Sequence, residues 1–113
     1  MNIVTLGIAS REQSNRRFLE AFAGKRQGAF ISFTSPALLF RTLSGKRWEL
    51  IRVMTGAGPM SIRELSRRLG RDVKAVHRDV HILLDAGILQ KNEKNRIIFP
   101  YDAVKVDFLL QAA

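Results

Sequence analysis

The chain has 113 residues, the length of one domain. Hydrophobic residues make up 46% of it, so it can bury a core and is not a disordered tail. The absence of cysteine excludes disulfides, thiolate nucleophiles and sulfur-ligated zinc, and it fits a reducing compartment. No segment approaches the ~20 apolar residues of a membrane span, and the first residues lack the basic start of a signal peptide. We therefore expect a cytoplasmic protein.

The chain is strongly basic. Lys and Arg number 19 against 10 Asp and Glu, which gives a formal net charge of +9. The excess is concentrated in residues 41–81, whereas residues 82–113 are balanced. A polyanion such as nucleic acid is the expected partner.

The first 34 residues predict a strand–helix–strand unit. Val4, Leu6 and Ile8 stand at every second position and predict a strand over 2–9. A capping box at Ser10 predicts a helix that ends at Gly24, and a second strand follows over 30–34. Such a unit is too small to bury its own apolar faces. We expect it to pack on the rest of the chain, on a second copy or on a partner.

Residues 35–113 predict helices followed by a hairpin. Each helix begins near a serine or aspartate cap, or after a turn. The predicted helices cover 35–43, 46–55, 61–69 and 72–86, and short strands over 88–90 and 96–99 flank a polar turn. Alternation around Lys105 and Asp107 predicts a last strand, although Leu109-Leu110 is equally compatible with a helix.

This element order is that of a winged helix-turn-helix, so the predicted fold class is α+β with an N-terminal strand–helix–strand extension. The extension covers 1–34, and the DNA-binding domain with its C-terminal tail covers 35–113. Burial of Val76, Val80 and Leu83 would turn the opposite face of helix 72–86 outward. The candidate base-reading residues on that face are Lys74, Ala75, His77, Arg78 and His81.

A second set of residues is expected to contact the DNA backbone. It comprises Ser61, Arg63, Arg67 and Arg71 around the preceding helix, and Lys91, Lys94 and Arg96 at the hairpin. Asp79 is expected to pair with an arginine of the group Arg63, Arg67, Arg68 and Arg71 and to hold two helices in register. For the arginines and the hairpin alike, a solvated surface is an equally good interpretation.

One run of the sequence extends from Ser61-Ile62-Arg63-Glu64-Leu65 through Leu69-Gly70-Arg71-Asp72 and Val76-His77-Arg78-Asp79-Val80 to Gly87-Ile88-Leu89. This run resembles prokaryotic winged-helix regulators of the sugar-operon repressor type. The longer stretch from Phe33-Thr34-Ser35-Pro36 to Phe99-Pro100-Tyr101-Asp102 is similar to small regulators that often act as antitoxins of toxin–antitoxin modules. The effector-binding domain of the larger repressors does not follow the hairpin, which puts induction by a small molecule in doubt.

We therefore expect a sequence-specific regulator of transcription, a repressor that binds a palindromic operator as a homodimer. The alternative is an antitoxin that neutralises a toxin protein and autoregulates its operon. A small basic ribonuclease is a weaker alternative, because no nucleophile–base set is evident. His77 and His81 have metal-ligand spacing but lack a third ligand, so we expect no metal, cofactor or catalytic residue. We expect Phe18, Phe22, Phe33 and Trp48 to pack in the core rather than stack on bases.

Overall fold

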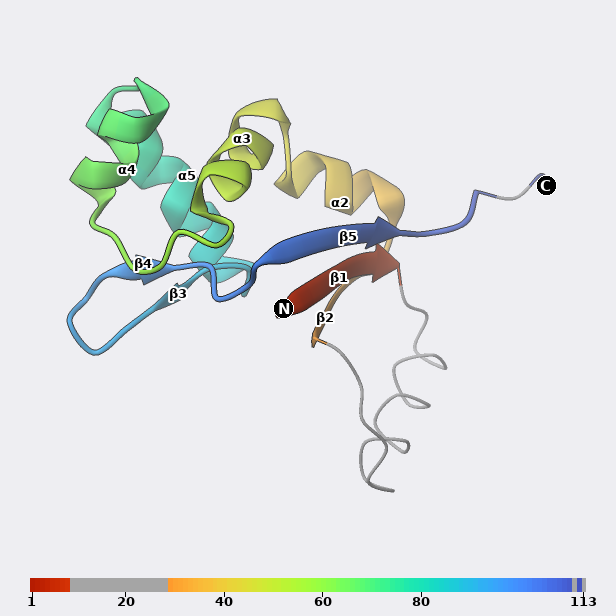
Figure 1. Ribbon diagram of the computed structural model, residues 1–113. Helices are drawn as coiled ribbons and strands as arrows, with labels where there is room; N and C mark the ends of the chain where they lie inside the picture. The colour runs from red at the N-terminus through yellow and green to blue at the C-terminus, as the bar shows by residue number, and fades with distance from the viewer. Residues whose placement is uncertain (9–28, 111, 113) are drawn as a thin grey trace.

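The computed structural model describes residues 1–8, 29–110 and 112 (Figure 1). Within these residues the protein is an α+β fold with a parallel sheet, a short hairpin and four helices, which confirms the α+β part of the predicted fold class. The elements are β1 (Ile3–Ile8), β2 (Ala29–Phe33), α2 (Pro36–Thr42), α3 (Gly45–Met54), α4 (Ile62–Leu69), α5 (Val73–Asp85), β3 (Gln90–Lys91), β4 (Ile97–Ile98) and β5 (Ala103–Asp107). The helix predicted over 10–24 lies outside the described residues, as do Phe18 and Phe22.

The three-stranded sheet joins the two ends of the chain. Its order is β2-β1-β5, and β1 pairs in parallel with both neighbours, so that Leu6 faces Ile31 on one side and Val106 on the other. The prediction of a last strand is confirmed by β5, and Leu109-Leu110 is not helical. The sheet thus takes strands from both sides of the boundary expected after residue 34.

Gly7 allows β1 and β5 to approach each other. A Cβ at this position would lie 2.7 Å from the carbonyl oxygen of Asp107 and 3.0 Å from the ring of Phe30. A side chain larger than hydrogen would therefore push the two strands apart.

The helices begin where the caps predict. Hydroxyl groups of Ser35 and Ser61 each accept an N–H hydrogen bond at 3.1 Å, from Leu38 and Glu64 respectively. Ser61 and Glu64 have the spacing of a capping box, but only the serine half forms, because the carboxylate of Glu64 pairs with arginines on its own helix. α4 ends at Gly70, whose φ of 65° is the left-handed conformation that glycine adopts most easily.

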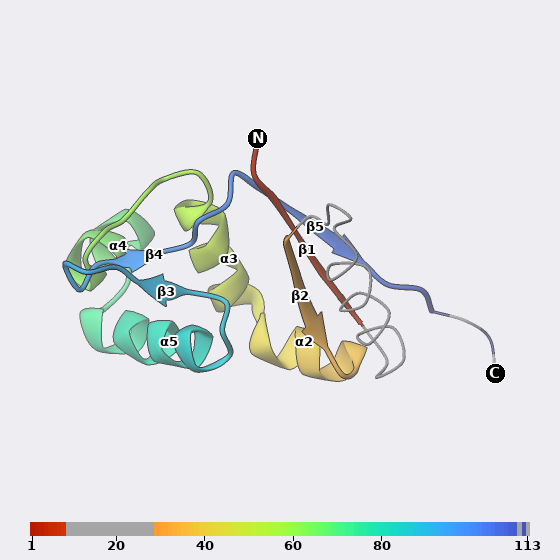
Figure 2. The ribbon, with the colours of Figure 1, turned by 90° about the horizontal axis from the view of Figure 1, so that it is seen from below.

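One hydrophobic core runs through the sheet and the helices. Figure 2 shows α3 between the three-stranded sheet on one side and α4, α5 and the hairpin on the other. It includes Val4 and Leu6 of β1 as well as Val76, Val80 and Leu83 of α5. The hairpin joins the same core through Ile97, whose backbone pairs with that of Met60 before α4. No helix of the described chain combines the length and the apolar character needed to cross a membrane.

Trp48 corrects one expectation about the core. Phe33 is buried as predicted, but Trp48 remains 39% exposed. α3 turns Leu50, Ile51 and Met54 inward, which leaves Trp48 at the edge of the buried face, beside Val104 of β5. Trp48, Ile51 and Met54 stand three residues apart in the sequence, a spacing that predicts one buried stripe, whereas in the structure only Ile51 and Met54 are buried.

Candidate nucleic-acid interface

α5 has one face in the core and one face in solvent. The side chains of Val76, Val80 and Leu83 are fully buried. On the opposite face, Lys74, His77 and Arg78 are exposed, and Ala75 and His81 are half-buried. Asp72 caps the first turn by accepting the N–H of Lys74 at 3.2 Å. The predicted division of this helix into a buried and a basic face is therefore present in the structure.

A buried carboxylate fixes α5 relative to the preceding helices. Asp79 is 8% exposed, and its two oxygens accept hydrogen bonds from Arg47 of α3 at 3.2 Å and Arg71 at 2.8 Å. Arg47 also donates to the backbone oxygens of Thr42 and Arg41, at 2.6 and 2.7 Å. The end of α2, the start of α3, the α4–α5 turn and α5 are thus joined through one acidic residue.

Sequence reasoning found only part of this network. Arg71 belongs to the group expected to pair with Asp79, but Arg47 stands 32 positions before Asp79 and was not expected. The spacing of residues along the chain does not show which helices pack together, so no local pattern predicted the contact between Arg47 and Asp79. The side chain of Arg71, which is also predicted to contact DNA, is 20% exposed, and its Nη1 is buried without a hydrogen-bond partner in the described residues.

A basic hollow lies where the start of α3 meets α5. Its volume is about 470 Å³, and it is lined by Ser44, Gly45, Lys46, Arg47, Arg71, Ala75, Arg78 and Asp79. Ser44 stands at the N-cap of α3, but its side chain makes no capping hydrogen bond. The positive end of a helix, an exposed lysine and an exposed arginine thus border one depression, which suits a phosphate-sized anion. Lys46 was missed, although Ser-Gly-Lys at a predicted helix start is a usable signal.

The arginines of α4 are not equally free to bind an external phosphate. Arg67 and Arg68 both pair with Glu64, the latter at 3.0 Å. Arg63 is exposed and has no ion pair among the described residues. The hydroxyl of Ser61 serves as the cap of α4. Among the residues predicted around this helix, Arg63 is therefore the cation best placed for an external phosphate.

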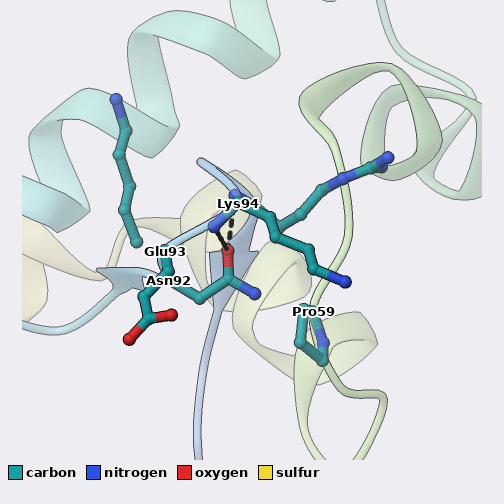
Figure 3. Close-up of a pocket in the computed structure, with 6 residues that line it drawn as sticks. Pro59, Asn92, Glu93 and Lys94 are labelled. Atoms are coloured by element: carbon teal, nitrogen blue, oxygen red, sulfur yellow. Dashed lines mark hydrogen bonds between the residues drawn. The ribbon is translucent and has the colours of Figure 1, made fainter.

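The hairpin turn presents a second basic surface. The side-chain oxygen of Asn92 accepts the N–H groups of Lys94 and Arg96, at 3.0 and 2.9 Å, and so shapes the turn (Figure 3). Lys91, Lys94 and Arg96 are all exposed, as expected for residues at the turn of the hairpin. Together with Pro59, Asn92 and Glu93 they line a shallow hollow of about 640 Å³.

The two histidines of α5 contact each other. Their Nε2 atoms are 3.1 Å apart and their ring centroids 4.3 Å apart, so one ring donates a hydrogen bond that the other accepts. The described residues contain no group of three or more potential metal ligands. In this arrangement His77 and His81 extend the polar face of α5.

Comparison with known proteins gives a match to a protein family. The model of the HVO_A0114 family matches residues 42–106, which include α3, α4, α5, the hairpin and most of β5. No curated protein and no solved structure matches the chain. Since the matched segment is more than half of the chain, the protein belongs to the HVO_A0114 family.

Proposed function

We propose that this protein is a cytoplasmic transcription regulator that binds double-stranded DNA through a winged helix-turn-helix. In this proposal α3, α4 and α5 form the three-helix unit and β3–β4 is the wing. The observation that carries it is the outward face of α5. Lys74, His77 and Arg78 are exposed on a capped helix whose other face buries Val76, Val80 and Leu83.

Such a helix suits the major groove. The groove is about 12 Å wide, admits one helix, and presents many hydrogen-bond acceptors on its base edges. Arg78 has the planar donor group that pairs with O6 and N7 of guanine, and Lys74 and His77 are donors to bases or phosphates. The contact of Asp79 with Arg47 and Arg71 stabilises α5 in one orientation, as base reading requires.

Basic groups flank α5 and supply the expected backbone contacts. The hollow at the start of α3 contributes Lys46, and the hairpin contributes Lys91, Lys94 and Arg96. Phosphate contacts set the register of the protein on the duplex, and base contacts provide specificity. A single module reads few base pairs, so we propose a homodimeric repressor on a palindromic operator.

The test begins with selection of bound duplexes from a random pool, which should enrich a palindrome. On the selected duplex, Arg78→Ala should cost about 1–3 kcal/mol and relax the preference at one base position. Lys94→Ala should weaken binding to all duplexes equally and reduce the slope of log K against log salt by about one unit. Fluorescence anisotropy of labelled duplexes at several salt concentrations measures both effects.

Arg52→Ala is the matched control. Arg52 lies near the opposite end of α3 from the basic hollow, so at protein concentrations that keep the dimer formed its loss removes one positive charge and should leave the base preference unchanged. Equal losses from Arg78→Ala on selected and random duplexes would contradict base reading by α5. Preference for single-stranded RNA over duplex DNA would contradict the whole proposal.

A further inference from the structure

The outer edge of β5 is open in the described part of the chain. β5 pairs with β1 on one side, and no described strand pairs with its other side. Apolar side chains gather at this edge and beyond it, with exposed fractions of 42% for Val106, 78% for Leu109 and 89% for Leu110. An open edge with apolar side chains is a surface on which another strand can pair.

The charges on β5 are self-complementary. Lys105 and Asp107 flank Val106, and both are exposed. When two copies of β5 pair antiparallel about a two-fold axis at Val106, Lys105 faces Asp107 of the partner subunit, and the reverse pair forms as well. Directly opposite charges of unlike sign stabilise such a pair of strands.

Neighbouring registers lack this match. Moving the axis by one residue places Lys105 opposite Lys105 or Asp107 opposite Asp107, and like charges directly opposite are destabilising. An axis between two residues places Lys105 or Asp107 opposite Val106 and mixes the polar and apolar faces. Among these registers, only the one centred on Val106 places unlike charges opposite each other and also keeps the polar and apolar faces of the two strands aligned.

The apolar face of the strand supports the same register. Val104 then faces Phe108 of the partner subunit. Val104 lines a hollow of about 250 Å³ with Trp48, Ile51, Arg52 and Thr55 of α3. Phe108 itself packs edge-on against Phe40, with ring centroids 5.7 Å apart. In this register the partner's Phe108 would lie over the hollow and cover part of Trp48.

We propose that the partner of this edge is a second copy of the chain, joined by antiparallel β5–β5 pairing centred on Val106. The two sheets then form one sheet of order β2-β1-β5-β5-β1-β2 across an isologous interface. This interface supplies the dimer expected on a palindromic operator, and in that respect alone the inference rests on the proposed function. In this dimer the C-terminal strand β5, and not the 1–34 segment, makes the main contact between the two subunits.

Cysteine cross-linking of the full chain tests the register, because the natural sequence has no cysteine. Under mild oxidation without DNA, Val106→Cys should form a disulfide-linked dimer, since facing residues of paired strands lie within disulfide range. Lys105→Cys and Asp107→Cys should each cross-link poorly alone but efficiently when mixed. Val106→Lys places two lysines at the axis and should raise the dissociation constant of the dimer at least about tenfold in sedimentation.

The outcomes separate this inference from DNA binding. A chain that stays monomeric at tens of micromolar, or a dimer in which Val106→Cys does not cross-link, overturns the interface whatever the chain binds. A monomer that pairs only with the product of a neighbouring gene overturns it in favour of a toxin-binding surface. A dimer with the expected cross-links that ignores duplex DNA supports the interface and contradicts the proposed function.

Discussion

Asp79 is the acidic side chain that joins α5 to the rest of the helices. Replacing it with alanine leaves Arg47 and Arg71 facing each other without an anion, in a region where their side chains are only 18% and 20% exposed. Breaking a buried ion pair costs about 3–5 kcal/mol, and partial exposure of both arginines reduces this. We expect Asp79→Ala to lower the free energy of unfolding by about 2 kcal/mol, measured by urea denaturation.

Glu49→Ala is the control for an exposed ion pair. A hydrogen bond from Arg52, with a smaller contribution from its charge, holds the pKa of Glu49 below its ordinary value. The pair lies in solvent, however, so its loss should leave the unfolding midpoint nearly unchanged. Equal shifts for the two variants would show that burial of Asp79 contributes nothing.

At the residue scale, the sequence predicted what depends on local periodicity. The buried valines and the basic side chains of α5 follow from helical spacing, and they lie where expected. Arg47 and the exposure of Trp48 were missed. Both depend on which side of α3 meets α5 and β5, and this is a property of tertiary packing.

At the element scale, the turn between α4 and α5 depends on Gly70. Its φ of 65° is left-handed, and a Cβ there would meet no neighbouring atom, so the only penalty for a side chain is backbone strain. We expect Gly70→Ala to lower the free energy of unfolding by about 1 kcal/mol. Thermal denaturation followed by circular dichroism measures the change.

Gly45→Ala isolates the effect of backbone strain. Gly45 is the first residue of α3, its φ is not positive, and a Cβ there also meets nothing within 4 Å. Alanine should therefore be neutral or stabilising by about 0.5 kcal/mol. A loss of stability at Gly45 as large as that at Gly70 would mean that φ does not explain the effect.

Elements with local signals were predicted well. Capping residues and glycines predicted the ends of the helices α2 to α5 to within about two residues, because capping is a local interaction. The parallel pairing of β1 with β5 was not predicted, since the strands are about a hundred residues apart and their alternation carries no information about partners. For the candidate site, the basic face of α5 was predictable, but the hollow at the start of α3 was not.

At the scale of the whole molecule, the sheet and the helices share one core. Val4 and Leu6 of β1 belong to the same buried cluster as Leu50 of α3 and Leu83 of α5. Backbone bonds add to this connection, since the N–H of Gly56 donates to the oxygen of Tyr101 at 2.9 Å. A core shared in this way favours unfolding in a single cooperative transition.

Gly7→Ala tests that cooperativity from the sheet side. The added methyl group would press on the backbone of β5, and overpacking of this kind costs about 1–3 kcal/mol. Ser32→Thr is the control, because it also adds one methyl group at the position that pairs with Gly7, but on an exposed side chain of β2. Trp48 is the single tryptophan and lies on α3 beside Val104 of β5, so its fluorescence reports on the contact between the helices and the sheet. For Gly7→Ala we expect the urea midpoint from Trp48 fluorescence to fall together with that from circular dichroism at 222 nm, where the helices dominate the signal. If the fluorescence midpoint fell while the dichroism midpoint stayed at the wild-type value, the sheet would unfold as a unit separate from the helices.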